Sequence, residues 1–190
     1  MTGPRLEPIA PGSLDGDQRA LYDAIVGGPR ASVPHVFRLV EDDGTLVGPF
    51  NAFLLQPRVG QALQELGAAL RFRTGLSDRA REVAILVVAA VQESDFEWYA
   101  HEAIGRHVGL TTDELDRLRA GRFDVLADPH ERLVAETTHA LAVAGDLDDE
   151  QYGRVETELG RPALLELLTI VGYYGLLALQ LRVFRVPAPA

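Results

Sequence analysis

The chain has 190 residues, contains no cysteine and carries a formal net charge of −10 at neutral pH. This acidic balance disfavours nucleic acid and anionic membranes as partners, because both need clustered positive charge. Without cysteine there is no disulfide, thiolate metal site or thiol nucleophile, and without lysine there is no Schiff-base catalysis by a lysine side chain. Hydrophobic residues make up 47% of the sequence, so the chain can bury a substantial core.

The N-terminal residues are rich in proline and glycine and contain no apolar segment of signal-peptide length. We therefore predict an irregular arm over residues 1–13, a single all-helical domain over residues 14–187 and a cytoplasmic location. Ser13 is the predicted N-cap of a first helix that ends at Val26, before a pair of glycines. Residues 30–48 are expected to form a long loop that can include a hairpin and whose length suits a task such as closing a pocket.

Two polar residues, Asn51 and Arg73, lie next to the following predicted helical segments. Asn51 precedes a predicted helical turn at 52–55, where it serves either as a helix cap or as a substrate contact. A helix over residues 57–72 then ends next to Arg73, a position where a cation complements the helix macrodipole. Arg73 is also a candidate for substrate binding.

The longest apolar run of the chain extends from Val83 to Val91 and follows Ser77, a predicted N-cap. An uninterrupted run of this kind favours a helix buried on nearly all sides, and it is too short to span a membrane. Glu82 opens the run. Because desolvation disfavours its charge, this carboxylate must find a partner or stay protonated, which makes it the first candidate site residue.

The next predicted helix starts at about Ser94 and ends at about residue 108. Ser94 and Glu97 stand at capping-box spacing, so Glu97 either caps this helix or belongs to a site. Glu97 and His101 are four residues apart and project from one helical face. One imidazole near two carboxylates suits acid–base chemistry, although His101 can also be a core histidine bonded to Glu82 or Glu97. We predict that Glu82 contacts His101.

Four more helices are expected at about residues 112–119, 130–144, 148–159 and 163–184. The last is almost wholly apolar, like the Val83 to Val91 run, so the two halves can be diverged copies of one helical unit. His130 or His139 could complete a metal site with His101 and Glu97, but no HxxxH or HExxH spacing occurs and we predict no metal. Nucleotide-binding and serine-hydrolase motifs are also absent from the sequence, and His35 stays unassigned.

The acid–base residues also carry a family resemblance. Glu82, followed by Glu97-Trp98, His101 and a helix end at Arg106-His107-Val108-Gly109-Leu110, resembles the carboxymuconolactone decarboxylase family of the alkylhydroperoxidase-D-like superfamily. The resemblance extends from Leu14 to Pro187 and includes Gly48-Pro49-Phe50-Asn51 and Val171-Gly172-Tyr173-Tyr174. In the peroxidase branch a CxxC pair occupies the positions of Ser94 and Glu97. This chain is therefore not expected to be a thiol peroxidase.

The resemblance implies an all-α bundle of about seven or eight helices that assembles as a homotrimer or a hexamer. It also implies a cofactor-independent lyase (decarboxylase) or isomerase that acts on a small carboxylated lactone or conjugated acid. His101 would protonate the carbanionic carbon or polarise the carbonyl, Glu82 would orient His101, and Glu97 would relay the proton.

An arginine, either Arg73 or Arg81, is expected to hold a second carboxylate of the substrate. The predicted substrate-binding set is completed by Asn51, Trp98 and Ser94. A hypothesis from a different class is a non-catalytic or ligand-binding homologue that kept the fold without the redox cysteines. Convergence of Glu82, Glu97 and His101 distinguishes the two, because a binding protein does not need it.

Overall fold

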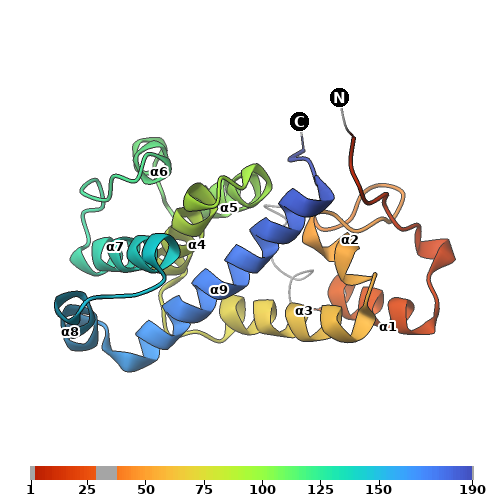
Figure 1. The fold of residues 1–190 in the computed structure, drawn as a ribbon. Helices are drawn as coiled ribbons and strands as arrows, with labels where there is room; N and C mark the ends of the chain where they lie inside the picture. The colour runs from red at the N-terminus through yellow and green to blue at the C-terminus, as the bar shows by residue number, and fades with distance from the viewer. Residues whose placement is uncertain (1–2, 29–37, 190) are drawn as a thin grey trace. The chain divides into compact units, whose positions relative to one another are not determined.

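The computed structural model describes residues 3–28 and 38–189. Within these ranges the chain forms nine α-helices and a short 3-10 turn, Pro11–Ser13 (Figure 1). The helices are α1 (Gly16–Val26), α2 (Pro49–Phe53), α3 (Pro57–Phe72), α4 (Asp78–Val91), α5 (Asp95–His107), α6 (Thr112–Arg119), α7 (Pro129–Ala144), α8 (Asp149–Glu158) and α9 (Gly160–Phe184). The predicted all-α class is confirmed.

The chain divides into two compact units, one made of Met1–Arg73 with Gln180–Ala190 and the other of Thr74–Leu179. In the first unit, α3 packs against α1 and α2. The loop predicted at 30–48 lies partly outside the described residues, and His35 lies wholly outside them. Its described part holds one antiparallel bridge, between Val40 and Leu46.

The first helix begins later than predicted. Its N-cap is Asp15, which accepts a hydrogen bond of 2.8 Å from the backbone N–H of Gln18, while the Gln18 side chain accepts one from the Asp15 N–H. This reciprocal capping box satisfies two backbone donors, which a serine cap two residues earlier does not. Ser13 instead lies in the 3-10 turn and donates to Ala10, so the prediction of Ser13 as N-cap was wrong.

Asn51 holds the N-terminal arm. Its amide oxygen accepts from the backbone N–H of Ile9 at 2.9 Å, and its amide nitrogen donates to the backbone oxygen of Glu7 at 3.1 Å. The N-cap of α2 is Gly48, so Asn51 is not the cap of that helix. Both polar ends of the buried side chain are therefore used to fix the arm.

In the second unit, α4 is the central helix, and α5, α6 and α7 pack against it (Figure 1). Its start is fixed by Ser77, whose hydroxyl accepts from the backbone N–H of Ala80 at 3.1 Å, as predicted. Every residue from Ala80 to Ala89 is buried. The uninterrupted apolar run therefore forms a helix surrounded by its neighbours, as its sequence pattern predicts.

A guanidinium group ties this central helix to two of its neighbours. Arg79 of α4 donates from Nε to Glu131 of α7 at 3.0 Å and pairs through Nη2 with Glu114 of α6. Burial raises the pKa of Glu114, but hydrogen bonds from Thr111 and Arg79 outweigh it and leave that pKa below its usual value. A cation that α4 supplies therefore favours the charged form of Glu114 and forms an ion pair with Glu131.

Helix α9 is long and apolar enough to meet the length and composition requirements for a membrane span, with 44% of the relevant window buried. The core helix of a globular protein meets the same requirements, so this is weak evidence for a membrane. Buried residues such as Leu167, Ile170 and Leu177 follow one another along one side of the helix at three- and seven-residue intervals. That periodicity is typical of a helix that packs against protein.

The dependence of the fold on α4 can be measured. Leu86→Ala removes a side chain that is 0% exposed, so we expect the free energy of unfolding to fall by about 2–5 kcal/mol in urea denaturation. The control Val143→Ala changes a side chain that is 62% exposed, and we expect a change within about 0.5 kcal/mol. Equal effects of the two substitutions would contradict the central position of α4.

Candidate functional site

The site begins with a fully buried carboxylate on α4. Glu82 is 0% exposed, and its Oε2 lies 2.7 Å from Nδ1 of His101 on α5. This contact confirms the one predicted from the sequence. An ionised carboxylate can only accept a hydrogen bond, so we assign the proton to Nδ1, which leaves Nε2 as the basic nitrogen of a neutral imidazole.

Glu97 lies on the other side of the same imidazole. Its Oε2 is 3.6 Å from Nε2 of His101, and the side chain is 5% exposed. It does not cap its own helix, because α5 starts at Ser94 without a side-chain cap. The backbone N–H of Ser94 bonds to Ala89 instead, at 2.9 Å. The structure therefore favours the site interpretation of Glu97 over the capping one.

The environment of Glu97 favours its neutral form. The pKa of this carboxyl is raised to about 7. Burial is the largest cause, His101 partly opposes it, and Glu82 adds to it. Near neutral pH the protonated and ionised forms of Glu97 are therefore both populated. Glu82, His101 and Glu97 thus form a row in which protons can be shared between a carboxylate, an imidazole and a second carboxyl.

Arg81 lies beside the first member of this row. Its Nε is 3.9 Å from Oε1 of Glu82, and its Nη2 donates to Asp78 at 2.7 Å. Neither Nε of Arg81 nor Oε1 of Glu82 has a hydrogen-bond partner among the described residues. Since a buried charge needs a nearby opposite charge, Arg81 supplies the balance for Glu82. Its predicted role in holding a substrate carboxylate stays a prediction.

Tyr174 of α9 contributes a contact that sequence reasoning missed. Its ring packs edge to face against the His101 imidazole, with centroids 5.1 Å apart and planes at 89°, and Tyr173 packs against Tyr174 in the same way. The adjacent pair of tyrosines in a largely aliphatic helix was the available signal. The aromatic ring restricts the orientation of the imidazole between its two carboxylates.

The other predicted substrate-binding residues have different surroundings. Trp98 is 5% exposed, and its indole N–H donates to Glu102 at 2.9 Å while the Arg119 guanidinium lies 5.0 Å from its ring centroid. Ser94 is buried at the N-cap of α5. Arg73 is exposed at the C-cap of α3 and, like Asn51, belongs to the other compact unit. Substrate binding by these four residues stays a prediction.

Gly105 allows α5 to approach α4 closely. It lies one turn after His101, and a Cβ at this position would be 2.9 Å from Leu110 Cδ1 and 3.2 Å from Leu86 Cδ1. Ordinary carbon contacts are longer, so a larger residue would have to displace these leucines. The spacing of the two helices that carry Glu82 and His101 is therefore limited at this glycine.

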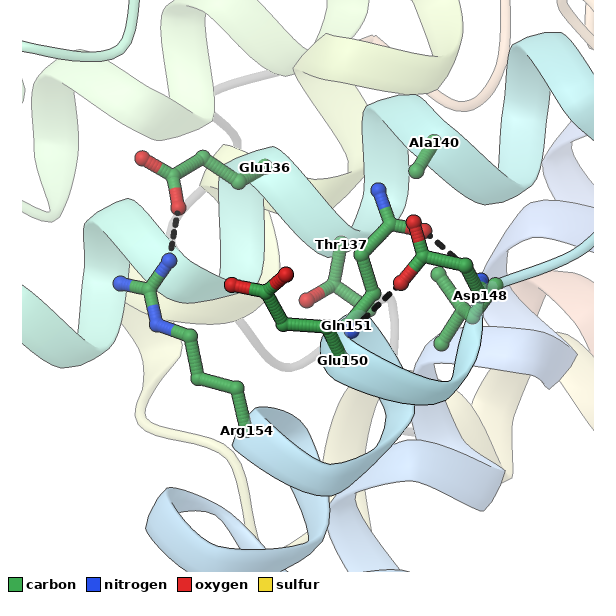
Figure 2. Close-up of a pocket in the computed structure, with 8 residues that line it drawn as sticks. Glu136, Thr137, Ala140, Asp148, Glu150, Gln151 and Arg154 are labelled. Atoms are coloured by element: carbon green, nitrogen blue, oxygen red, sulfur yellow. Dashed lines mark hydrogen bonds and ion pairs between the residues drawn. The ribbon is translucent and has the colours of Figure 1, made fainter.

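A separate groove lies between α7 and α8, with a volume of about 320 Å³ (Figure 2). Its polar groups largely serve the local structure: Arg154 donates to Glu136 at 2.8 Å, and Asp148 caps α8 through the backbone N–H of Gln151. None of the acid–base residues lines it. We therefore place the candidate site at His101 and not in this groove.

The described residues contain no group of three or more His, Asp or Glu side chains with the geometry of a metal site. The histidines considered for such a site have other neighbours. His139 packs against the Phe123 ring with centroids 5.5 Å apart, and Nδ1 of His130 lies 3.5 Å from Asp128.

The comparisons with known proteins agree with this architecture. The sequence model of the Carboxymuconolactone decarboxylase family matches residues 57–144, which include α4, α5 and all three acid–base residues. No curated protein matches the sequence.

Several solved structures share the fold. A peroxidase-related protein from Ralstonia eutropha JMP134 with an alkylhydroperoxidase AhpD core has a TM-score of 0.75 at 15% identity, over 100% of this chain and 94% of that one. A peroxidase-related protein from Silicibacter sp. TM1040 has a TM-score of 0.73 at 13% identity, over 100% and 94%. The debrominase Bmp8 has a TM-score of 0.73 at 10% identity, over 96% and 91%.

Together, the family match and the shared helical architecture confirm the resemblance predicted from the sequence. Residues 57–144 match the carboxymuconolactone decarboxylase family model, and the chain shares its fold with a protein that has an alkylhydroperoxidase AhpD core. This chain carries no cysteine in any position, so neither position of the CxxC pair holds a thiol.

The raised pKa of Glu97 makes stability depend on pH. Since the folded state holds this proton more tightly than the unfolded state, its stabilising effect is complete below pH 4.5 and is lost as the pH rises to about 7. We expect the loss to be about 3 kcal/mol, and Glu97→Gln to abolish it, in urea denaturation at pH 5 and pH 8. The exposed control Glu150→Gln should keep the wild-type difference, and a Glu97→Gln protein that also keeps it would contradict the assignment.

Proposed function

We propose that this protein is a cofactor-independent lyase (decarboxylase) or isomerase that acts on a small carboxylated lactone or a similar conjugated acid. The observation that carries the proposal is the buried Glu82–His101–Glu97 row, with contacts of 2.7 Å and 3.6 Å on the two sides of one imidazole. Such a row moves protons without a thiol or a bound metal. The family match supports the reaction class.

In the proposed decarboxylation, the bond between the carboxylate carbon and its neighbour breaks and carbon dioxide leaves. The electron pair enters a carbonyl conjugated with that neighbour, so the substrate itself is the electron sink. The carbanionic carbon then takes one proton from the His101–Glu97 pair, and solvent restores this proton after the product leaves. Glu82 orients His101 and balances the imidazolium charge.

The geometry favours this proposal over the ligand-binding alternative. A binding protein has no need for two carboxylates on one imidazole, and burying them costs stability unless the charges are balanced. Glu97 does not cap its helix, and His101 is only 7% exposed. The debrominase among the structural neighbours supports catalysis on this fold, although its identity to this chain is only 10%.

A panel of conjugated carboxylic acids, followed by loss of ultraviolet absorbance, tests the activity. We expect His101→Ala and Glu82→Gln each to lower kcat by about 10²–10⁴-fold, because one loses the imidazole and the other cannot balance its charge. His107→Ala, an exposed histidine of the same helix, is the control and should behave like wild type. Equal turnover of wild type and His101→Ala would reject the catalytic proposal, provided that circular dichroism shows both to be folded.

We also propose a homotrimer or a hexamer as the assembly. A row of exposed leucines on α9 supports it, because successive steps of three, eight and three residues keep them near one helical face. Their exposed fractions are 65%, 46%, 42% and 53% for Leu165, Leu168, Leu176 and Leu179. A continuous apolar surface of this kind is typical of an interface.

Light scattering at micromolar concentration checks the assembly. We expect a mass of three or six chains for wild type and a smaller mass when Leu165→Glu and Leu179→Glu are combined, because the interface would then bury charges. Val143→Glu places the same charge on an exposed apolar position of α7 and should leave the mass unchanged. A monomeric wild type would contradict the proposal.

A further inference from the structure

Both ring nitrogens of His101 point at carboxyl groups. Nδ1 lies 2.7 Å from Glu82, Nε2 lies 3.6 Å from Glu97, and the ring packs against Tyr174. A substrate that took its proton directly from Nε2 would have to displace Glu97 from its place opposite that nitrogen. The arrangement therefore puts the imidazole in the middle of the row and not at its end.

Of the two carboxyl groups that end the row, Glu97 is the less completely buried. Its Oε2 faces Nε2 of His101 at 3.6 Å, which is longer than an ordinary hydrogen bond. Its side chain keeps an exposed fraction of 5% and that of His101 keeps 8%, whereas the side chain of Glu82 at the opposite end has none. A carboxyl whose nearest polar neighbour is this far away can gain a shorter hydrogen bond from a bound substrate.

We infer that Glu97, through Oε1, exchanges the proton with the substrate, and that His101 works behind it as a relay. This inference rests on the proposed acid–base function and reverses the order of the two residues within it. Oε1–H gives its proton to the carbanionic carbon and leaves Glu97 ionised; after turnover Nε2 of His101 takes a proton from solvent and passes it to Oε2. No oxidant, metal or additional reactant enters the balance.

The charge of Glu97 then selects the substrate. A neutral carboxyl accepts an anionic carboxylated substrate beside it, whereas an ionised one repels the substrate and has no proton to give. The charged or titratable groups that surround the pair are Glu82 and Arg81 from α4 and Tyr174 from α9. Because burial raises the pKa of Glu97 to about 7, turnover of such acids should fall as the pH rises above neutrality.

Chemical rescue tests the inference with a substrate that the wild-type protein turns over. We expect Glu97→Ala to lower kcat by at least about a hundredfold and added formate or acetate to restore at least tenfold, with a rate that follows the pKa of the added acid. His101→Ala should not respond to these acids. Glu97→Ala activity within tenfold of wild type, or no rescue by either acid, would overturn the inference.

A second measurement needs no substrate. Small diazo compounds esterify protonated carboxyl groups, so at pH 7 a diazoacetamide should label Glu97 faster than the exposed carboxylate Glu150, as read by mass spectrometry of peptides. Glu82, which is 0% exposed, should stay unlabelled. Labelling of Glu97 should decline as the pH rises past about 7. A Glu97 that reacts no faster than Glu150 would overturn the inference.

The two measurements separate the inference from the proposed function. An acid panel without turnover, combined with rapid labelling of Glu97, rejects the substrate class and supports Glu97 as the reachable acid. Turnover of the panel by wild type, combined with unlabelled Glu97 and an active Glu97→Ala variant, supports the enzyme and returns the proton transfer to His101.

Discussion

The constraint on which the second compact unit depends is the complete burial of one carboxylate in its most apolar helix. Glu82 opens a run of residues that pack on all sides, and it can stay charged there only if neighbouring groups balance it. His101 from α5 and Arg81 from α4 are those groups. The site therefore depends on the core, because α4 provides both the apolar side chains and the carboxylate that they would otherwise exclude.

Much of the fold could be predicted because local signals and burial agreed. Pro57 and Phe72 bound α3 as the sequence indicated, and Ser77 caps α4 because its hydroxyl is the acceptor nearest to the free N–H groups of that helix. The prediction of where the first helix begins was wrong, because two residues of capping type lie close together. Ser13 is a good cap by type, but Asp15 has a glutamine at the third helical position that returns the bond.

The candidate site was predictable in part for the same reason. The contact between Glu82 and His101 could be predicted because a carboxylate in an apolar helix needs a polar partner. The imidazole of His101 on the next helix is a suitable one. The role of Glu97 could not be decided from sequence, since Ser94 and Glu97 have the spacing of a cap as well as of a site. Tyr174 comes from a helix some seventy residues away, and only tertiary packing brings its ring to His101.

Gly105 has a consequence for how this protein can vary. The residue takes no part in proton transfer, yet a side chain there would meet Leu86 and Leu110 and would press α5 away from α4. A map of mutational tolerance would therefore show a crowded position that no chemical argument about the reaction explains. A change at residue 97 would alter the acid–base groups, whereas a methyl group at residue 105, about two turns further along the same helix, would crowd the contact between the helices that carry them.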